Sequence, residues 1–212
     1  MEHIKNIEKL FSKEFVENPL IESFEIGNIN LPSGNLVALD PLTTSGMPSF
    51  QVKFPVGKFP VIIHKERDNN CVAYAEIVFS KQKPASWTMA TLEGQRLEEL
   101  GKGEIFGYPV QSGMGCFMDE KTQEELEKLE QVLIERQGDD YQGLYQAFFH
   151  EYFYEKDGAV HQWAILKPSE EFDGTIASFE AGLGEGFYAS YIGFSSEGAP
   201  VKIVTEFIEV GS

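Results

Sequence analysis

The sequence predicts an α+β fold in which a largely antiparallel sheet, or sheets, packs against two central amphipathic helices. Short apolar segments separated by Gly-, Asn- and Pro-containing turns occupy the first and last thirds of the chain. Two stretches with helical periodicity lie between them, at about residues 121–153. Strands that are grouped before and after helices, and do not alternate with them, are typical of the α+β class.

The length and composition predict one domain that spans residues 1–212. Of the 212 residues, 42% are hydrophobic, which is enough to bury a core. We find no internal repeat and no linker long enough to divide the chain. A short N-terminal helix, at about residues 3–17, is expected on the outside of the domain. Its apolar positions recur at helical spacing: Ile4, Ile7, Leu10 and Phe11.

Strands are predicted on both sides of the helical region. Before it, the expected strands are residues 36–40, 50–54, 59–64, 71–79 and 87–90. After it, they are residues 160–166, 175–179, 187–194 and 201–208. The pattern predicts a hairpin between the segments 50–54 and 59–64, and a final hairpin between the last two segments. Asp157-Gly158 predicts a further hairpin turn.

The segment from Gly107 to Thr122 leads from strands into the first central helix, and Asp119 is positioned to cap that helix. Thr122 and Glu125 also match a capping box. The second helix carries an aromatic face, which predicts packing in the core. Its members are Tyr141, Leu144, Tyr145, Phe148, Phe149 and Tyr152.

The charge balance restricts the possible partners. The formal net charge is −17, from 34 acidic and 17 basic residues. Such a chain repels nucleic acid and anionic membrane surfaces, because binding to phosphates depends on Lys and Arg. A basic protein is the partner that this charge favours, although acidity can also serve solubility alone.

Several features predict a cytoplasmic protein. The N-terminal residues lack the apolar stretch of a signal peptide, and no run approaches the roughly 20 apolar residues that span a bilayer. The chain has two cysteines, Cys71 and Cys116, and both have apolar neighbours. Without a secretory signal, these are expected to be free thiols in a reducing compartment.

Several motifs together resemble a mostly bacterial family called domain of unknown function 4241. They span about residues 34–207 and comprise Gly34–Leu42, Val72–Ile77, Gly107–Asp119, Gly184–Gly193 and Val204–Phe207. The run Gly-Cys-Phe-Met-Asp, residues 115–119, is the most specific of them. Residues 182–186 read Gly-Leu-Gly-Glu-Gly where relatives are expected to have Gly-Trp-Gly-Asp-Gly. The resemblance implies a fold and carries no activity.

Two enzymatic hypotheses remain open. Cys116 would be a nucleophile if a helix N-terminus lowered its pKa and a histidine lay close by, although its apolar neighbours favour a buried structural thiol. Alternatively, Asp40, Asp119 and Glu185 would form a hydrolase-type carboxylate site if the fold brought them together. Capping explains Asp119, and a turn explains Asp40, without such a site. The chain lacks a Gly-x-Ser-x-Gly motif and metal-ligand spacings, so neither a metal nor a cofactor is expected.

The remaining hypothesis is a non-enzymatic binding module, immunity-like in that an acidic surface captures a basic protein. Residues 182–191 are predicted to form an exposed loop. Its aromatic residues would supply buried anchors within a charged rim. The candidate binding residues are Asp40, Glu185, Tyr188 and Tyr191.

Overall fold

The computed structural model describes residues 2–12, 18–154 and 158–210. The described part is a mixed α+β fold with twelve strands and three helices, two of them central and one short and N-terminal, as the sequence predicts. Every strand pair in the described residues is antiparallel. No described helix combines the length and the apolar character that a membrane crossing requires.

The α-helices, in chain order, are α1 (Glu2–Ser12), α2 (Glu120–Gln137) and α3 (His150–Phe153), and a π-helix (Tyr145–Phe149) runs directly into α3. Two short 3-10 helices lie at Leu97–Glu99 and Gly138–Asp140. The strands are β1 (Ile21–Leu31), β2 (Leu36–Leu39), β3 (Gly57–Glu66), β4 (Cys71–Val78), β5 (Ser86–Met89), β6 (Tyr108–Val110), β7 (Met114–Asp119), β8 (Trp163–Leu166), β9 (Ile176–Glu180), β10 (Gly186–Tyr188), β11 (Ser190–Phe194) and β12 (Pro200–Glu206).

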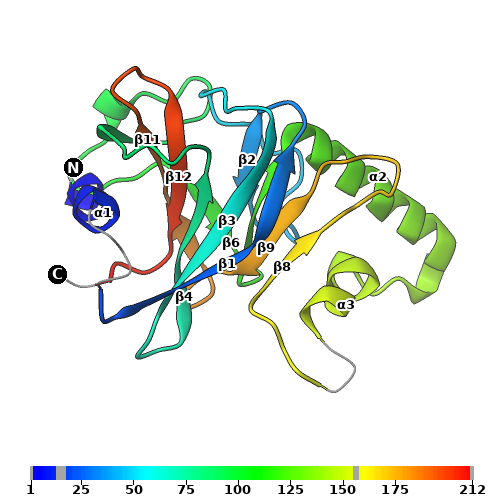
Figure 1. Ribbon diagram of the computed structural model, residues 1–212. Helices are drawn as coiled ribbons and strands as arrows, with labels where there is room; N and C mark the ends of the chain where they lie inside the picture. The colour runs from blue at the N-terminus through cyan, green and yellow to red at the C-terminus, as the bar shows by residue number, and fades with distance from the viewer. Residues whose placement is uncertain (1, 13–17, 155–157, 211–212) are drawn as a thin grey trace.

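The strands form two main sheets between two layers of helix (Figure 1). The large sheet has the order β1-β3-β4-β12-β11-β5, and the small sheet has the order β2-β7-β9-β8. β10 and β6 form a separate two-stranded ribbon. In Figure 1, α1 covers the outer side of the large sheet, while α2 and α3 lie beside the small sheet.

Three apolar cores follow from these layers. The first lies between the two sheets and includes Ile63, Phe117 and Phe179. The second joins the small sheet to the central helices, through residues such as Met118 and Phe149. The third joins the large sheet to α1 and includes Phe11, Tyr74 and Tyr191. Alternating residues of each strand therefore face different cores, because successive side chains point to opposite sides of a sheet.

The structure corrects the predicted strand at residues 50–54. Phe50 forms only an isolated bridge with Leu92, and residues 51–56 form an irregular segment without strand structure. Residues 57–66 instead pair with β1 and β4. The long strand β1 was not predicted, because its polar and apolar residues do not alternate regularly. A bulge between Glu25 and Gly27 interrupts the register and explains this irregular pattern.

The central helices also differ from the sequence prediction. Asp119 is the N-cap of α2, and its side chain accepts a hydrogen bond from Lys121 N at 3.1 Å. Thr122 is buried within the helix, so the predicted capping box does not form. The aromatic helix is shorter than predicted, beginning at Leu144, and it contains a π-helical turn. The Asp157-Gly158 turn and the end of the predicted N-terminal helix lie at least partly outside the described residues.

Candidate binding site

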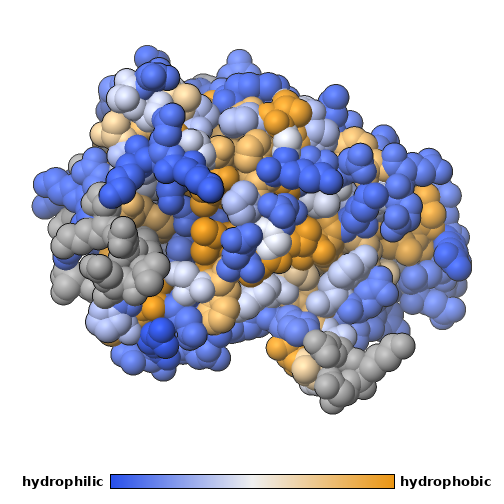
Figure 2. Space-filling model, in the orientation of Figure 1, coloured by the Kyte–Doolittle hydropathy of each residue, from blue (hydrophilic) through white to orange (hydrophobic). Residues whose placement is uncertain are grey.

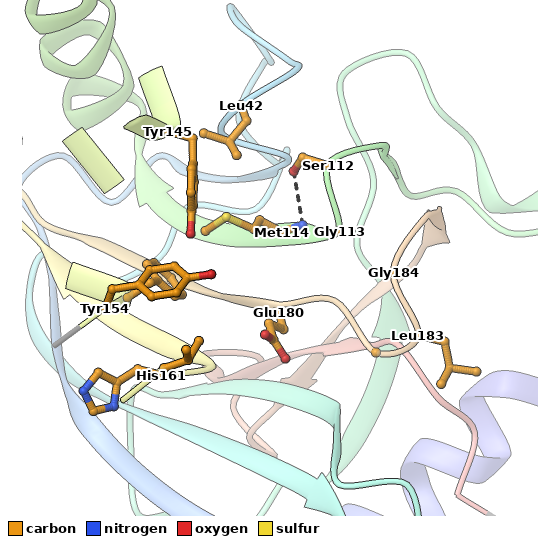
Figure 3. A pocket seen from close by; sticks show the side chains of 13 residues that line it. Leu42, Ser112, Gly113, Met114, Tyr145, Tyr154, His161, Glu180, Leu183 and Gly184 are labelled. Carbon is orange, nitrogen blue, oxygen red and sulfur yellow. Dashed lines mark hydrogen bonds between the residues drawn. The ribbon is translucent and has the colours of Figure 1, made fainter. Parts of the chain in front are cut away.

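A pocket of about 480 Å³ opens beside the small sheet, where several loops meet the π-helix and α3 (Figure 3). Its lining comes from six separate parts of the chain. The residues are Leu42, Ser112, Gly113, Met114, Tyr145, Phe153, Tyr154, Val160, His161, Glu180, Gly182, Leu183 and Gly184. A cavity of this size with mixed polar and apolar walls is typical of a ligand site.

Asp40 lies behind one wall of the pocket and holds that wall in place through hydrogen bonds. This fully buried carboxylate follows β2. It accepts hydrogen bonds from the backbone N–H groups of Leu42 (2.9 Å), Gln111 (2.9 Å) and Ser112 (2.7 Å), and from Ser112 Oγ (2.8 Å). Burial opposes ionisation, but these hydrogen bonds outweigh it and lower the pKa of the Asp40 carboxyl. Asp40 therefore remains a charged structural anchor that joins two segments of the pocket wall.

Two glycine-rich loops form the adjoining wall. Ala181 N donates to Gly113 O at 2.9 Å, which fixes the loop after β9 against the loop before β7. Gly182 has φ +54°, and a Cβ there would lie 2.8 Å from the Cβ of Phe207. A side chain at Gly182 would therefore be strained both by the backbone and by its neighbour. The glycines of this segment shape the pocket, while Leu183 extends from it with 78% of its surface exposed.

The polar side chains that line the pocket are Ser112, Tyr145, Tyr154, His161 and Glu180, and Glu180 is the only carboxylate among these lining residues. Glu180 ends β9 directly opposite Met114 of β7, and it is half-buried. Its Oε2 accepts a hydrogen bond from Gln162 Nε2 at 2.8 Å. In the described part of the chain, no Lys, Arg or His forms an ion pair with this carboxylate. The pocket thus contains a negative charge whose described partner is a neutral amide.

The two tyrosines lie on the helical side of the pocket. Burial raises the pKa of Tyr145, and the hydroxyl of Tyr154 and the charge of Glu180 raise it further. The Tyr145 hydroxyl is therefore neutral near pH 7. Figure 3 shows the Tyr145 hydroxyl pointing towards the Tyr154 side, with the Glu180 carboxylate between Tyr154 and Leu183. The arrangement offers a carboxylate beside aromatic surface, which is a favourable environment for a cation.

The structure places Cys116 away from any site. This thiol lies in the middle of β7, is fully buried and belongs to the apolar core beneath the central helices. Burial raises its pKa well above the ordinary value, and the charge of Asp40 raises it further. A neutral, enclosed thiol is a poor nucleophile, so the geometry gives the Cys116 hypothesis no support.

The fold does not bring the three candidate carboxylates together. Asp119 pairs with Leu36 at the start of β2, whereas Asp40 follows the end of that strand. Four residues of strand separate the two positions by roughly 13 Å. Asp119 accepts bonds from Ser33 Oγ (2.7 Å) and Gly34 N (2.8 Å). Glu185 is exposed in the turn before β10. No described group of three His, Cys, Asp or Glu side chains is arranged to hold a metal ion.

The predicted exposed loop at residues 182–191 is only partly exposed. Phe187 has 52% of its surface exposed, but Tyr191 is fully buried. The prediction is wrong for Tyr191 because β11 lies inside the large sheet, between β12 and β5. Tyr188 is half-buried, and its hydroxyl donates to Gly184 O at 2.9 Å. Its described role is to hold the loop that forms the pocket wall.

Sequence reasoning missed the residues that form the polar interior. Glu180 was absent from the candidates because it ends an ordinary strand and belongs to no recognised motif. Tyr145 was assigned to the core with the rest of the aromatic helix face, and Tyr154 was not singled out. The helical pattern did contain a signal for Tyr145. A tyrosine hydroxyl on a buried helix face needs a hydrogen-bond partner or a cavity, so its presence there could have indicated the pocket.

The fold and the pocket define an α+β protein with two antiparallel sheets and a ligand-sized cavity beside the smaller one. The chain belongs to the family described as protein of unknown function (DUF4241), whose family model matches residues 29–205. The resemblance seen in the sequence motifs is thereby confirmed. Searches of curated proteins and of solved structures gave no significant match.

Proposed function

We propose that the pocket beside the small sheet is a binding module, without catalysis of its own, that captures a basic protein partner by receiving a lysine side chain. The observation that carries the proposal is the Glu180 carboxylate, whose described hydrogen-bond partner is the neutral Gln162 amide. A carboxylate in a partly dehydrated pocket attracts a cation more strongly than one on an open surface, because water screens the attraction less.

The geometry favours a lysine over an arginine. Glu180 Oε2 already accepts a hydrogen bond from Gln162, which leaves Oε1 as the oxygen for an incoming donor. A guanidinium prefers to engage both carboxylate oxygens, whereas an ammonium acts as a compact point charge. The apolar surfaces of Met114 and Leu183 line the approach and suit the methylene stem of a lysine.

The remainder of the surface supports a basic macromolecular partner. The net charge of −17 raises the local concentration of cations and accelerates their association. Hydrophilic residues cover most of the face shown in Figure 2, with smaller apolar areas between them. Near the pocket, Leu183 and Val160 expose 78% and 56% of their surfaces. Apolar groups within a polar rim are the usual composition of a protein interface.

In this proposal, the protein acts in the cytoplasm and does not bind nucleic acid or membranes. An immunity-like role, in which the chain neutralises a basic toxin, is one form of the same function. The roles of the earlier candidates are reassigned. Asp40 and Tyr188 support the pocket walls, and Glu185 contributes charge near the rim, while Tyr191 belongs to the core.

The test is an NMR titration with a probe peptide, acetyl-Gly-Gly-Lys-Gly-Gly-amide, compared with the same peptide carrying norleucine in place of lysine. We expect the lysine peptide to shift the amide signals of Gly113, Gly182 and Gly184. We expect binding to weaken as salt is added, and we expect Glu180→Gln to raise the Kd of the lysine peptide about fivefold. Glu197→Gln, which changes an exposed acidic residue in the β11–β12 turn, is the matched control and should bind normally. Equal shifts with the norleucine peptide would refute the proposal.

A further inference from the structure

A second constellation of polar side chains lies on the large sheet, on the side that faces α1. Ser23 of β1 and His64 of β3 are directly paired across the two strands, and Ser23 Oγ lies 2.7 Å from His64 Nδ1. His64 Nε2 lies 2.8 Å from Glu76 Oε2 of the next strand, β4. Three neighbouring strands thus place a serine, a histidine and a glutamate in one hydrogen-bonded line.

Burial distinguishes the three members of this line. His64 and Glu76 expose 3% and 2% of their surfaces, whereas Ser23 is exposed. The ring of Phe11 from α1 contacts the His64 ring edge-on, with the centroids 5.5 Å apart. The histidine and the glutamate are therefore shielded from water, and the serine hydroxyl is the member of the line that solvent or a substrate reaches.

The charge state of Glu76 fixes the direction of the hydrogen bonds. Burial opposes its ionisation, but hydrogen bonds and charges from His64 and Lys202 outweigh this effect and lower the pKa of the Glu76 carboxyl. Glu76 is therefore a carboxylate and can only accept. It accepts from Lys202 Nζ at 2.5 Å through Oε1, and from His64 through Oε2.

It follows that His64 carries a proton on Nε2. His64 acts as a base in its neutral form, and in that form Nδ1 accepts the hydrogen bond that the Ser23 hydroxyl donates. A serine that donates to a histidine, which in turn donates to a carboxylate, is the arrangement that activates a serine nucleophile. In the usual triad the serine faces Nε2 and the carboxylate faces Nδ1. Here the serine faces Nδ1 and the carboxylate faces Nε2, but the roles of serine, base and orienting carboxylate are the same.

We infer that Ser23 is a reactive serine that accepts an acyl group from an ester, with His64 as its general base and Glu76 as the positioning residue. Ser23 Oγ bonds to the carbonyl carbon, and its proton passes to His64 Nδ1. The bond from this carbon to the alcohol oxygen breaks, and the same proton leaves with the alcohol. Water then adds to the acyl carbon and gives a proton to His64. The proton returns to Ser23 Oγ as the carboxylic acid is released.

This activity is separate from the proposed lysine pocket. The serine, the histidine and the glutamate belong to the large sheet, and none of them lines the pocket beside the small sheet. Either site can therefore fail its test without affecting the other. These three residues could not be connected from the sequence, because they lie on separate strands and meet only through the strand pairing. Glu76 alone belongs to one of the family motifs, Val72–Ile77.

The test is covalent labelling of the folded chain with a fluorophosphonate probe, followed by peptide mass spectrometry. The serine oxygen bonds to phosphorus, fluoride leaves, and His64 takes the proton. We expect stoichiometric labelling at Ser23, and we expect the labelling rate in Ser23→Ala to fall by about 100-fold, which is in the range of general-base assistance. Ser23→Ala and the control Ser86→Ala, described below, should both retain the far-ultraviolet circular dichroism of the parent, because the altered side chains are exposed.

The matched control is Ser86→Ala. Ser86 is also exposed and also lies on an edge strand of the same sheet, β5, but it has no described histidine partner. Its replacement should leave the labelling unchanged. The inference is overturned if the parent chain is not labelled, if Ser23→Ala is labelled as fast as the parent, or if Ser86→Ala loses the label.

Discussion

Replacement of Asp40 by alanine should destabilise the protein and loosen the pocket wall. Asp40 accepts hydrogen bonds from three backbone N–H groups and one hydroxyl, at 2.7 to 2.9 Å. Removal of a buried acceptor costs about 1–3 kcal/mol for each donor that it leaves without a partner. Gln111 and Ser112 are exposed, so water can replace part of the loss. We therefore expect a decrease of about 3 kcal/mol in the free energy of unfolding, below the sum of about 4–12 kcal/mol for four donors that lose their partner.

The assay is urea unfolding followed by circular dichroism. In a thermal melt of a chain of this size, the same loss of stability would lower the Tm by roughly 6–12 °C. Asp68→Ala, an exposed change in the β3–β4 turn, is the control and should stay within about 0.5 kcal/mol of the parent. If Asp40→Ala loses less than about 1 kcal/mol, the anchoring role assigned to this carboxylate is wrong.

Asp40 also has a defined pH signature. Its pKa is lower in the folded state than the ordinary value of 3.8, so its contribution is complete above that value. The contribution is lost as the pH falls through the lower folded pKa. Asp40→Ala should therefore lose less stability than the parent between neutral pH and strong acid. If the parent and Asp40→Ala lost the same free energy of unfolding on acidification, the hydrogen bonds to Asp40 would not favour its charged form.

Three further predictions concern other parts of the fold. Burial raises the pKa of Glu206 to about 7, against the effect of a hydrogen bond from Asn6. The free energy of unfolding should therefore fall as the pH rises from about 4.5 to 7. Urea titrations at several pH values should show that Glu206→Gln removes this dependence. Native thiol titration should detect Cys71, which is partly exposed, and should detect Cys116 only after unfolding; a second reactive native thiol would contradict its burial. Asp119→Ala should lower the free energy of unfolding by about 3 kcal/mol, because it removes both the α2 cap and the anchor of the residue 33–34 turn; a loss no greater than that of the exposed control Glu124→Ala would argue against this double role.

The sequence predicted the parts of the fold that local patterns specify. Helical periodicity predicted the central helices, and turn residues predicted the final hairpin, which the structure confirms as β11–β12. The predicted hairpin between residues 50–54 and 59–64 is wrong, because β3 pairs with β1 and β4. The aromatic helix was predicted too long, because periodicity cannot detect that its regular hydrogen bonding begins only at Leu144. The strand β1 was missed because its bulge disrupts the alternation of polar and apolar residues.

The candidate sites were harder to predict, because they depend on pairings between distant segments. Asp40 was named as a candidate binding residue, but the sequence could not show that it is buried and that its partners include the amides of residues 111 and 112. Glu180 becomes a pocket residue only through the pairing of β9 with β7. Ser23 meets His64 only through the register of β1 and β3. Strand register between distant segments is the information that one sequence lacks.

The central claim, that Glu180 binds the ammonium group of a lysine, is tested most directly by a double-mutant cycle. The cycle combines the parent and Glu180→Gln with the lysine and norleucine peptides, and NMR titration gives the four dissociation constants. The predicted coupling free energy is about 1 kcal/mol, which corresponds to a roughly fivefold difference in Kd. A coupling of zero, with the lysine peptide bound equally by both proteins, would contradict the proposed recognition.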